Sequence, residues 1–159
     1  MTTMKEAAAE FLSKKRIAVA GVSRESGSGH GGNPVYCRLR DRGYDVYPVN
    51  PNVGKVEGDS AYPNLKTIPG GVEAVVIATH PDAAPNVMEQ CIDEGIKLVW
   101  MHRGPGGGSV NHEAAEMGRG AGITVMEGGC PLMYDPTADV GHKIFRGVLS
   151  LVGRIPKEV

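Results

Sequence analysis

Five short apolar segments divide this chain and limit the folds that it can adopt. They cover residues 17–22, 46–49, 74–78, 98–101 and 123–126, and each is rich in valine or isoleucine. The segments are apolar at nearly every position rather than at alternate positions, which is typical of parallel strands buried on both faces. We therefore expect a parallel sheet whose buried side chains include Ile17, Val19, Val46, Val49, Val75, Ile77, Val99 and Val125.

Helical patterns fill most of the intervals between these segments. Residues 34–42, 83–94 and 110–119 each end next to a glycine, the common stop of a helix. Residues 51–71 are poor in repeating apolar positions, so a loop with a short helical turn is expected there. Right-handed crossovers then predict a doubly wound, Rossmann-like α/β fold in three layers (α/β/α). We expect a five-stranded parallel sheet in the order 3-2-1-4-5, with the first strand in the middle.

The size and charge of the chain narrow its class. Its 159 residues suit one domain over residues 1–159, with a helix in 1–15 and a closing helix in 137–152. The net charge of −1 provides no basic field for nucleic acid or an anionic membrane surface, and no apolar run is long enough to cross a bilayer. Three cysteines without metal-ligand spacing suit a reduced, cytoplasmic protein.

Glycine and serine crowd the segment that follows the first strand. Gly21, Val22, Ser23 and Arg24 are followed by six further small residues within 26–32, directly before a helical pattern. Small residues let backbone N–H groups approach phosphate oxygens, and a helix N-terminus adds positive potential. This segment is therefore predicted to bind phosphate.

The end of the second strand argues against NAD. The spacing after Gly21 does not fit the dinucleotide fingerprint, and a NAD site also requires an acidic residue after the second strand to hold the ribose hydroxyls. This chain has Asn50, Pro51 and then Lys55, with no carboxylate before Glu57. A lysine in this loop favours an anionic phosphate over a free ribose diol.

Polar side chains also follow the later strands, at the same edge of the predicted sheet. They are Thr79, His80 and Pro81 after the third strand, His102 and Arg103 after the fourth, and Cys130 after the fifth. A metal site, a cysteine–histidine nucleophilic pair and the polar lining of a ligand cleft are the three interpretations. The spacing supports no metal site and no third catalytic group, so the cleft lining is favoured, with Cys130 near its mouth.

With these residues in view, the chain resembles the small stand-alone CoA-binding proteins, which are similar to the N-terminal domain of the succinyl-CoA synthetase α-subunit and of ADP-forming acyl-CoA synthetases. The likeness extends from Arg16 to Leu151 and rests on the order and spacing of several motifs. These are residues 19–23, 43–51, 56–58, 62–65 and 98–101, and Cys130. One departure is the stretch 131–135, where many relatives carry methionine, lysine and then a Glu-His pair.

The resemblance implies coenzyme A as the ligand. It implies that Gly21–Arg24 hold a CoA phosphate, that Asn50, Pro51 and Lys55 flank the nucleotide, and that Thr79–Pro81 with His102 and Arg103 line the cleft. We expect a carrier, a sensor or a subunit that serves a partner enzyme, without ligase activity of its own. A homodimer, an NAD(P)-binding redox protein, an interaction module that has lost its ligand, and a small thiol- or metal-dependent enzyme using His80, His102 and Cys130 remain open.

Overall fold

The protein folds around one five-stranded parallel sheet. The computed structural model describes residues 2–24, 32–104, 107–134 and 158–159. The strands are β1 (Arg16–Ala20), β2 (Asp45–Val49), β5 (Ala74–Ile77), β6 (Leu98–Met101) and β9 (Thr124–Glu127). All neighbouring strands are parallel, so the predicted doubly wound, parallel α/β architecture is confirmed.

The order of the strands differs from the prediction. The sheet runs β2-β1-β5-β6-β9, so the third predicted strand lies beside the first, and the order 3-2-1-4-5 is wrong. The returning chain itself occupies the outer side of β2, because Tyr62 N donates to Pro48 O (2.9 Å) and Asn50 N donates to Tyr62 O (2.9 Å). Pro48 also has no N–H to offer a further strand. The next strand therefore pairs with β1, and β5 rather than β1 is the middle strand.

This order explains the one sheet residue that the prediction placed wrongly. Seven of the eight expected core residues of the sheet are buried, whereas Val46 is only half-buried. Val46 belongs to β2, which forms the end of the sheet and has a strand on one side alone. The same position leaves its neighbour Tyr47 half-buried.

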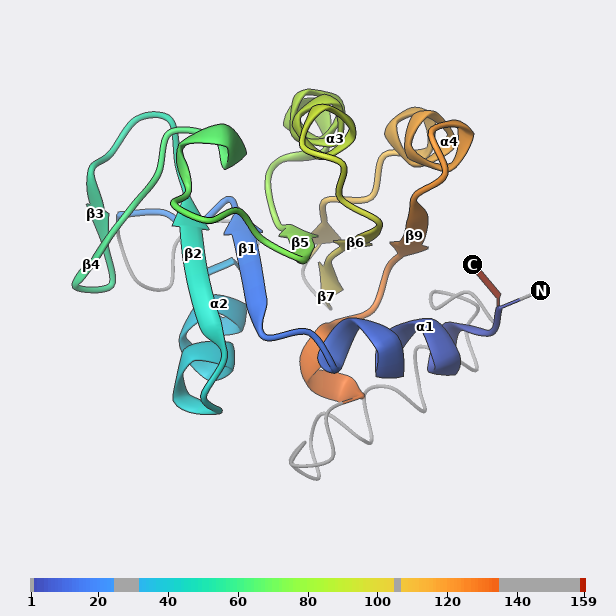
Figure 1. Cartoon of the computed structure of the whole chain (residues 1–159), viewed down its shortest axis with the longest axis horizontal. Coiled ribbons are helices and arrows are strands. Elements are labelled where there is room, and N and C mark those ends of the chain that lie inside the picture. Colours follow the sequence, from blue (N-terminus) through green and yellow to red (C-terminus); the bar gives the residue numbers. More distant parts are fainter. Residues whose placement is uncertain (1, 25–31, 105–106, 135–157) are drawn as a thin grey trace.

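Helices cover both faces of the sheet (Figure 1). Helices α1 (Met4–Leu12) and α2 (Gly32–Asp41) lie on one face, and α3 (Ala84–Asp93) and α4 (His112–Gly120) lie on the other. Successive residues of a strand enter opposite cores, so Val76 packs with α1 and α2 while Val75 packs with α3 and α4. The three layers are confirmed, and the helix expected within residues 1–15 is α1. The closing helix expected at 137–152 lies outside the described residues.

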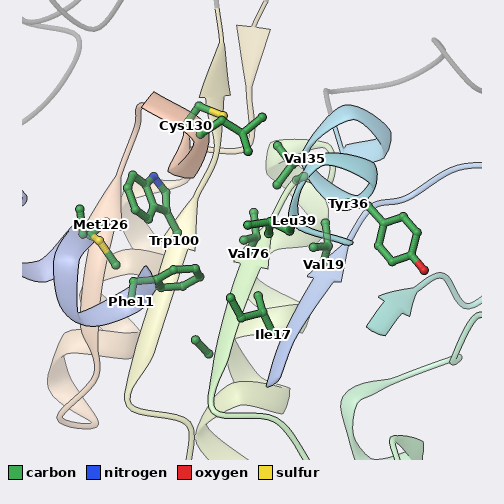
Figure 2. Packing of buried hydrophobic residues seen from close by; sticks show 14 of the residues in the cluster. Phe11, Ile17, Val19, Val35, Tyr36, Leu39, Val76, Trp100, Met126 and Cys130 are labelled. Carbon is green, nitrogen blue, oxygen red and sulfur yellow. The ribbon is translucent and has the colours of Figure 1, made fainter. Parts of the chain in front are cut away.

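The core beneath α1 is built on aromatic packing (Figure 2). Phe11 meets Trp100 edge to face, with ring centroids 5.5 Å apart and planes at 87°. Trp100 is fully buried and its indole N–H donates to Gly128 O at 2.9 Å.

No described helix is long and apolar enough to span a membrane.

Short elements fill the loops at the ends of the strands. Residues 51–71 hold the short helical turn that was expected, η1 (Leu65–Thr67), and also a hairpin that was not, β3 (Lys55–Val56) and β4 (Asp59–Ser60). A second small hairpin, β7 (Arg103–Gly104) with β8 (Gly107–Gly108), follows β6. Turns η2 (Pro81–Ala83) and η3 (Pro131–Met133) follow β5 and β9.

Candidate ligand-binding edge of the sheet

The strand order determines where the crevice of the sheet lies. In doubly wound sheets, ligands bind beyond the carboxyl ends of the strands at the point where the order reverses. The chain leaves β1 towards β2 and later returns to the other side of β1 as β5, so the reversal lies between β1 and β5. The loops that begin at Gly21 and at Ala78 therefore flank this crevice, and Ala78 N donates to Ala20 O at 2.8 Å.

Three backbone segments meet closely at the end of β1. A Cβ atom on Gly21 would lie 2.4 Å from Ala78 O, and a Cβ atom on Gly32 would lie 2.6 Å from Gly21 O. Gly21 also has φ of +99°, where a side chain is strained. The absent side chain of Gly21 thus serves packing against Ala78, and Gly32 lets the first turn of α2 press on the end of β1. The sequence had suggested phosphate access as the reason for Gly21.

A buried asparagine secures the loop after β1. The side-chain Oδ1 of Asn33 accepts from Ser23 N (2.9 Å) and from Ser23 Oγ (3.1 Å). Its Nδ2 donates to Ser23 O (2.9 Å) and to Glu57 Oε1 (2.7 Å). Asn33 is 2% exposed and lies in the first turn of α2. Ser23 is therefore held to the helix N-terminus, while Arg24 next to it is exposed.

The loop after β2 is attached to the same place. Asn50 Nδ2 donates to Val22 O at 2.9 Å, and Asn50 Oδ1 accepts from Asn52 N at 2.8 Å. Val22 is fully buried, so it belongs to the packing beneath this loop. Pro51 and Lys55 are exposed. The predicted site residues that follow β1 and β2 are thus joined, with Lys55 on the adjoining hairpin.

The loop after β5 presents its polar groups to solvent. Thr79 is half-buried, and the side chain of His80 is 60% exposed. His80 Nδ1 accepts from Asp82 N at 3.3 Å and lies 3.4 Å from the Asp82 carboxylate. Pro81 begins η2, and its carbonyl accepts from Asn111 Nδ2 at 3.0 Å. This loop can line one side of the crevice.

The turn after β6 separates its two predicted site residues. His102 is only 7% exposed, and its backbone N–H donates to Ile77 O at 2.9 Å. Arg103 is exposed, and its N–H donates to Gly129 O at 2.9 Å. Of this pair, Arg103 is the side chain that a ligand can reach directly.

Cys130 does not lie at the cleft mouth, and that expectation is wrong. It is 5% exposed and packs in the core with α2 and η3 (Figure 2). Burial raises the pKa of its thiol to about 11, so the reactive thiolate is disfavoured. Among the described residues no group of three or more potential ligands gathers into a metal site. The arrangement gives no support to an enzyme that uses His80, His102 and Cys130.

Sequence reasoning missed Asn33 and Glu57. Two signals for them exist: Asn33-Pro34 stands where the glycine run meets the helix, and Glu57-Gly58 is a two-residue turn between short strands. Both turn residues have positive φ, 50° and 83°, as a tight hairpin requires. Neither signal predicts that the turn reaches the N-terminus of α2.

The prediction also missed a cavity of about 340 Å³ beside the outer side of β2. Its walls include four of the five tyrosines of the chain, Tyr36, Tyr44, Tyr47 and Tyr62. The Tyr36 hydroxyl donates to Asp59, and Arg40 Nη1 donates to the same carboxylate at 2.7 Å. These two hydrogen bonds hold the pKa of Asp59 below its usual value. The cavity lies away from the crevice between β1 and β5.

Comparisons with known proteins agree with this architecture. An uncharacterized protein, YneT, of Bacillus subtilis is 33% identical over 113 residues, which are 70% of this chain and 78% of that protein. The ADP-forming acetate–CoA ligase II of Archaeoglobus fulgidus is 36% identical over 85 residues, 52% of this chain but only 12% of the ligase. A hypothetical protein from Pyrococcus horikoshii superposes with a TM-score of 0.69 at 33% identity, over 77% of this chain and 82% of that one. The family model described as a CoA binding domain matches residues 15–136, and the chain belongs to this CoA-binding family.

Proposed function

We propose that the protein binds coenzyme A or an acyl-CoA in the crevice between β1 and β5, with phosphate groups of the ligand at the loop after β1. Membership of the CoA-binding family carries this proposal. The loop geometry supports it, since the first turn of α2 presses on the end of β1, and free N–H groups of a helix N-terminus favour phosphate. Gly21, Val22 and Ser23 would shape the phosphate site, while the N–H groups of Gly21 and Ser23 already donate to Val49 O (3.2 Å) and Asn33 Oδ1 (2.9 Å).

Exposed cations supply the second support. Arg24 and Lys55 are exposed in the loop after β1 and the hairpin after β2. Both can reach out to phosphate without losing a buried contact, and such bonds are charge-assisted. Asn50 and Pro51 would flank the nucleotide. Thr79, His80 and Pro81, with the exposed Arg103 and the buried His102, would border the remainder of the ligand.

We propose the role of a carrier, a sensor or a subunit that serves a partner enzyme in the cytoplasm. The chain matches only 12% of the related acetate–CoA ligase, so we propose no ligase activity for this chain by itself. An NAD(P)-binding redox protein is the second candidate. One observation favours it: Glu57 brings a carboxylate to the loop after β1, although that carboxylate is hydrogen-bonded to Asn33.

Ligand preference tests the proposal. The purified protein is denatured and analysed by mass spectrometry for released CoA, and bound ligand is then removed before thermal unfolding is measured with CoA, dephospho-CoA and NAD. Ligand at about 100 times its Kd stabilises a fold by about 2.7 kcal/mol, which for a domain of this size raises the Tm by roughly 5–10 °C. We expect the largest increase with CoA and the smallest with NAD. A larger increase with NAD would favour the second candidate, and no increase with any ligand would favour an interaction module.

A further inference from the structure

We propose that Asn33 and Glu57 form a latch that holds the loop after β1 in its ligand-binding conformation, with Asn33 as the positioning residue. The inference rests on the proposed function, because it concerns the same loop. Nothing in the family match assigns a role to either side chain. The proposal stands on contacts between three segments that are distant in sequence.

Asn33 acts through a fully engaged side-chain amide. It takes part in four hydrogen bonds with described residues, three to Ser23 and one to Glu57. Because the amide both accepts from Ser23 N and donates to Ser23 O, it fixes the peptide groups on both sides of this residue. The Ser23 carbonyl faces Asn33, so the N–H on the other side of the same trans peptide, that of Arg24, is held pointing away from Asn33. A ligand phosphate at the loop would meet this donor already oriented, and such preorganisation lowers the cost of binding.

Glu57 reinforces the direction in which this amide points. The oxygen and nitrogen of an asparagine side chain can exchange places by rotation, but a carboxylate only accepts hydrogen bonds. The bond of 2.7 Å to Glu57 Oε1 therefore requires Nδ2 on the side of the hairpin, the same orientation that the N–H and carbonyl of Ser23 require.

The backbone of the β3–β4 hairpin is strained at Glu57. Glu57 has φ of 50°, and it is the one non-glycine residue with positive φ in the described part of the chain. Arg40 Nη1 donates to Glu57 O at 3.0 Å and ties the same turn to α2. A side chain is thus retained at a position that would favour glycine, which is expected if the carboxylate has a task.

Two substitutions of Glu57 distinguish the latch from a simple effect of its charge. Glu57→Ala and Glu57→Gln remove the same charge, but only glutamine keeps an oxygen acceptor for Asn33 Nδ2. We expect Glu57→Ala to weaken CoA binding about three- to tenfold and Glu57→Gln to stay within about twofold of the original protein. Asn33→Ala should weaken binding roughly tenfold or more, because it removes all four hydrogen bonds.

The experiment measures the CoA dissociation constant and the hydrogen exchange of the Ser23 amide in the same variants. Glu73→Ala is the matched control, since Glu73 accepts from Lys15 N and Arg16 N (3.2 Å each) at the opposite end of the sheet. It should leave the CoA affinity and Ser23 exchange unchanged. Equal effects of Glu57→Ala and Glu57→Gln on both readouts would overturn the latch.

Failure of the proposed function would be distinguishable from failure of the latch. If the unmodified protein does not bind CoA, the proposed function fails, while Ser23 exchange without ligand still tests the latch. Faster Ser23 exchange in Glu57→Ala but not in Glu57→Gln would then support the latch. Unchanged Ser23 exchange in Glu57→Ala would refute the latch. This test does not need the Asn33→Ala variant, so it holds even if that variant does not fold.

Discussion

The loops after β1 and β2 and those after β6 and β9 reach the same edge of the sheet but differ in how they are packed. Around the first two strands, Asn33, Asn50 and Glu57 form polar bridges, with Arg24 and Lys55 exposed beside them. Beyond the last two, the chain turns back over the core. There Arg103 N donates to Gly129 O at 2.9 Å, and His102 and Cys130 are buried. Position at the ligand edge therefore does not by itself make a residue available to a ligand.

The largest expected effect tests the close packing on the β1 side. Gly21→Ala would bring a Cβ atom to 2.4 Å from Ala78 O at φ of +99°. Strain and overpacking together should lower the free energy of unfolding by about 3 kcal/mol or more, measured by urea denaturation. Gly54→Ala is the control, because Gly54 is exposed and has nothing within 4 Å of its added Cβ; it should change stability by under about 0.5 kcal/mol. Equal changes in the free energy of unfolding of the two variants would show that the contact between Gly21 and Ala78 tolerates a side chain.

The affinity for CoA of variants at the exposed cations tests which loops hold the phosphates, those after β1 and β2 or those after β6 and β9. Arg24→Ala and Lys55→Ala should each weaken CoA binding roughly ten- to a hundredfold, the loss of one charge-assisted bond to phosphate. Arg103→Ala, which removes an exposed cation on the β6 side, should weaken it less. Isothermal titration of each variant with CoA measures the difference. The β6 side would become the phosphate side if the Arg103 variant lost the most affinity.

Cysteine chemistry tests burial on the β6–β9 side. Cys130 is 5% exposed and Cys37 is half-buried, so a thiol reagent should modify Cys37 first and Cys130 only on unfolding. Cys130→Ser should lower the free energy of unfolding by about 1–2 kcal/mol, since it buries a hydroxyl in an apolar core. Incubation with CoA disulfide should give no adduct that depends on Cys130. Rapid modification of Cys130 in the folded protein would contradict this packing.

The smallest effect concerns the hairpin that carries Lys55 and Glu57. The Tyr36 hydroxyl and Arg40 keep the pKa of Asp59 below its ordinary value of 3.8, so its contribution to stability is present above that pH and is lost in stronger acid. The Asp59 side chain is 44% exposed, and Asp59→Asn should therefore cost under about 1 kcal/mol at pH 7. That difference should shrink as the pH falls below about 4. A cost that stays constant from pH 7 to pH 2 would contradict the role of the charge.

The strands could be predicted because each is a continuous apolar run, but their order could not. It depends on Tyr62 pairing with Pro48 and Asn50, a contact that no local pattern specifies. For the site, the loop after β1 was predicted from its small residues. The bridge from Asn33 to Glu57 joins residues 24 positions apart, and the burial of Cys130 depends on how η3 packs against α2. Tertiary contacts of this kind leave no periodic signal in the sequence.

The position of β2 at the end of the sheet also bears on how the protein behaves at high concentration. A strand with open N–H and C=O groups is a template on which other molecules can aggregate. In β2, Asp45 N donates to Lys15 O (3.0 Å) and Val49 O accepts from Gly21 N (3.2 Å), so Asp45, Tyr47 and Val49 direct their backbone groups inward to β1. Of the two outward residues, Pro48 has no N–H and its carbonyl is taken by Tyr62, which leaves only Val46. One residue is too short a template, and intermolecular strand addition is thereby disfavoured at the β2 end of this sheet.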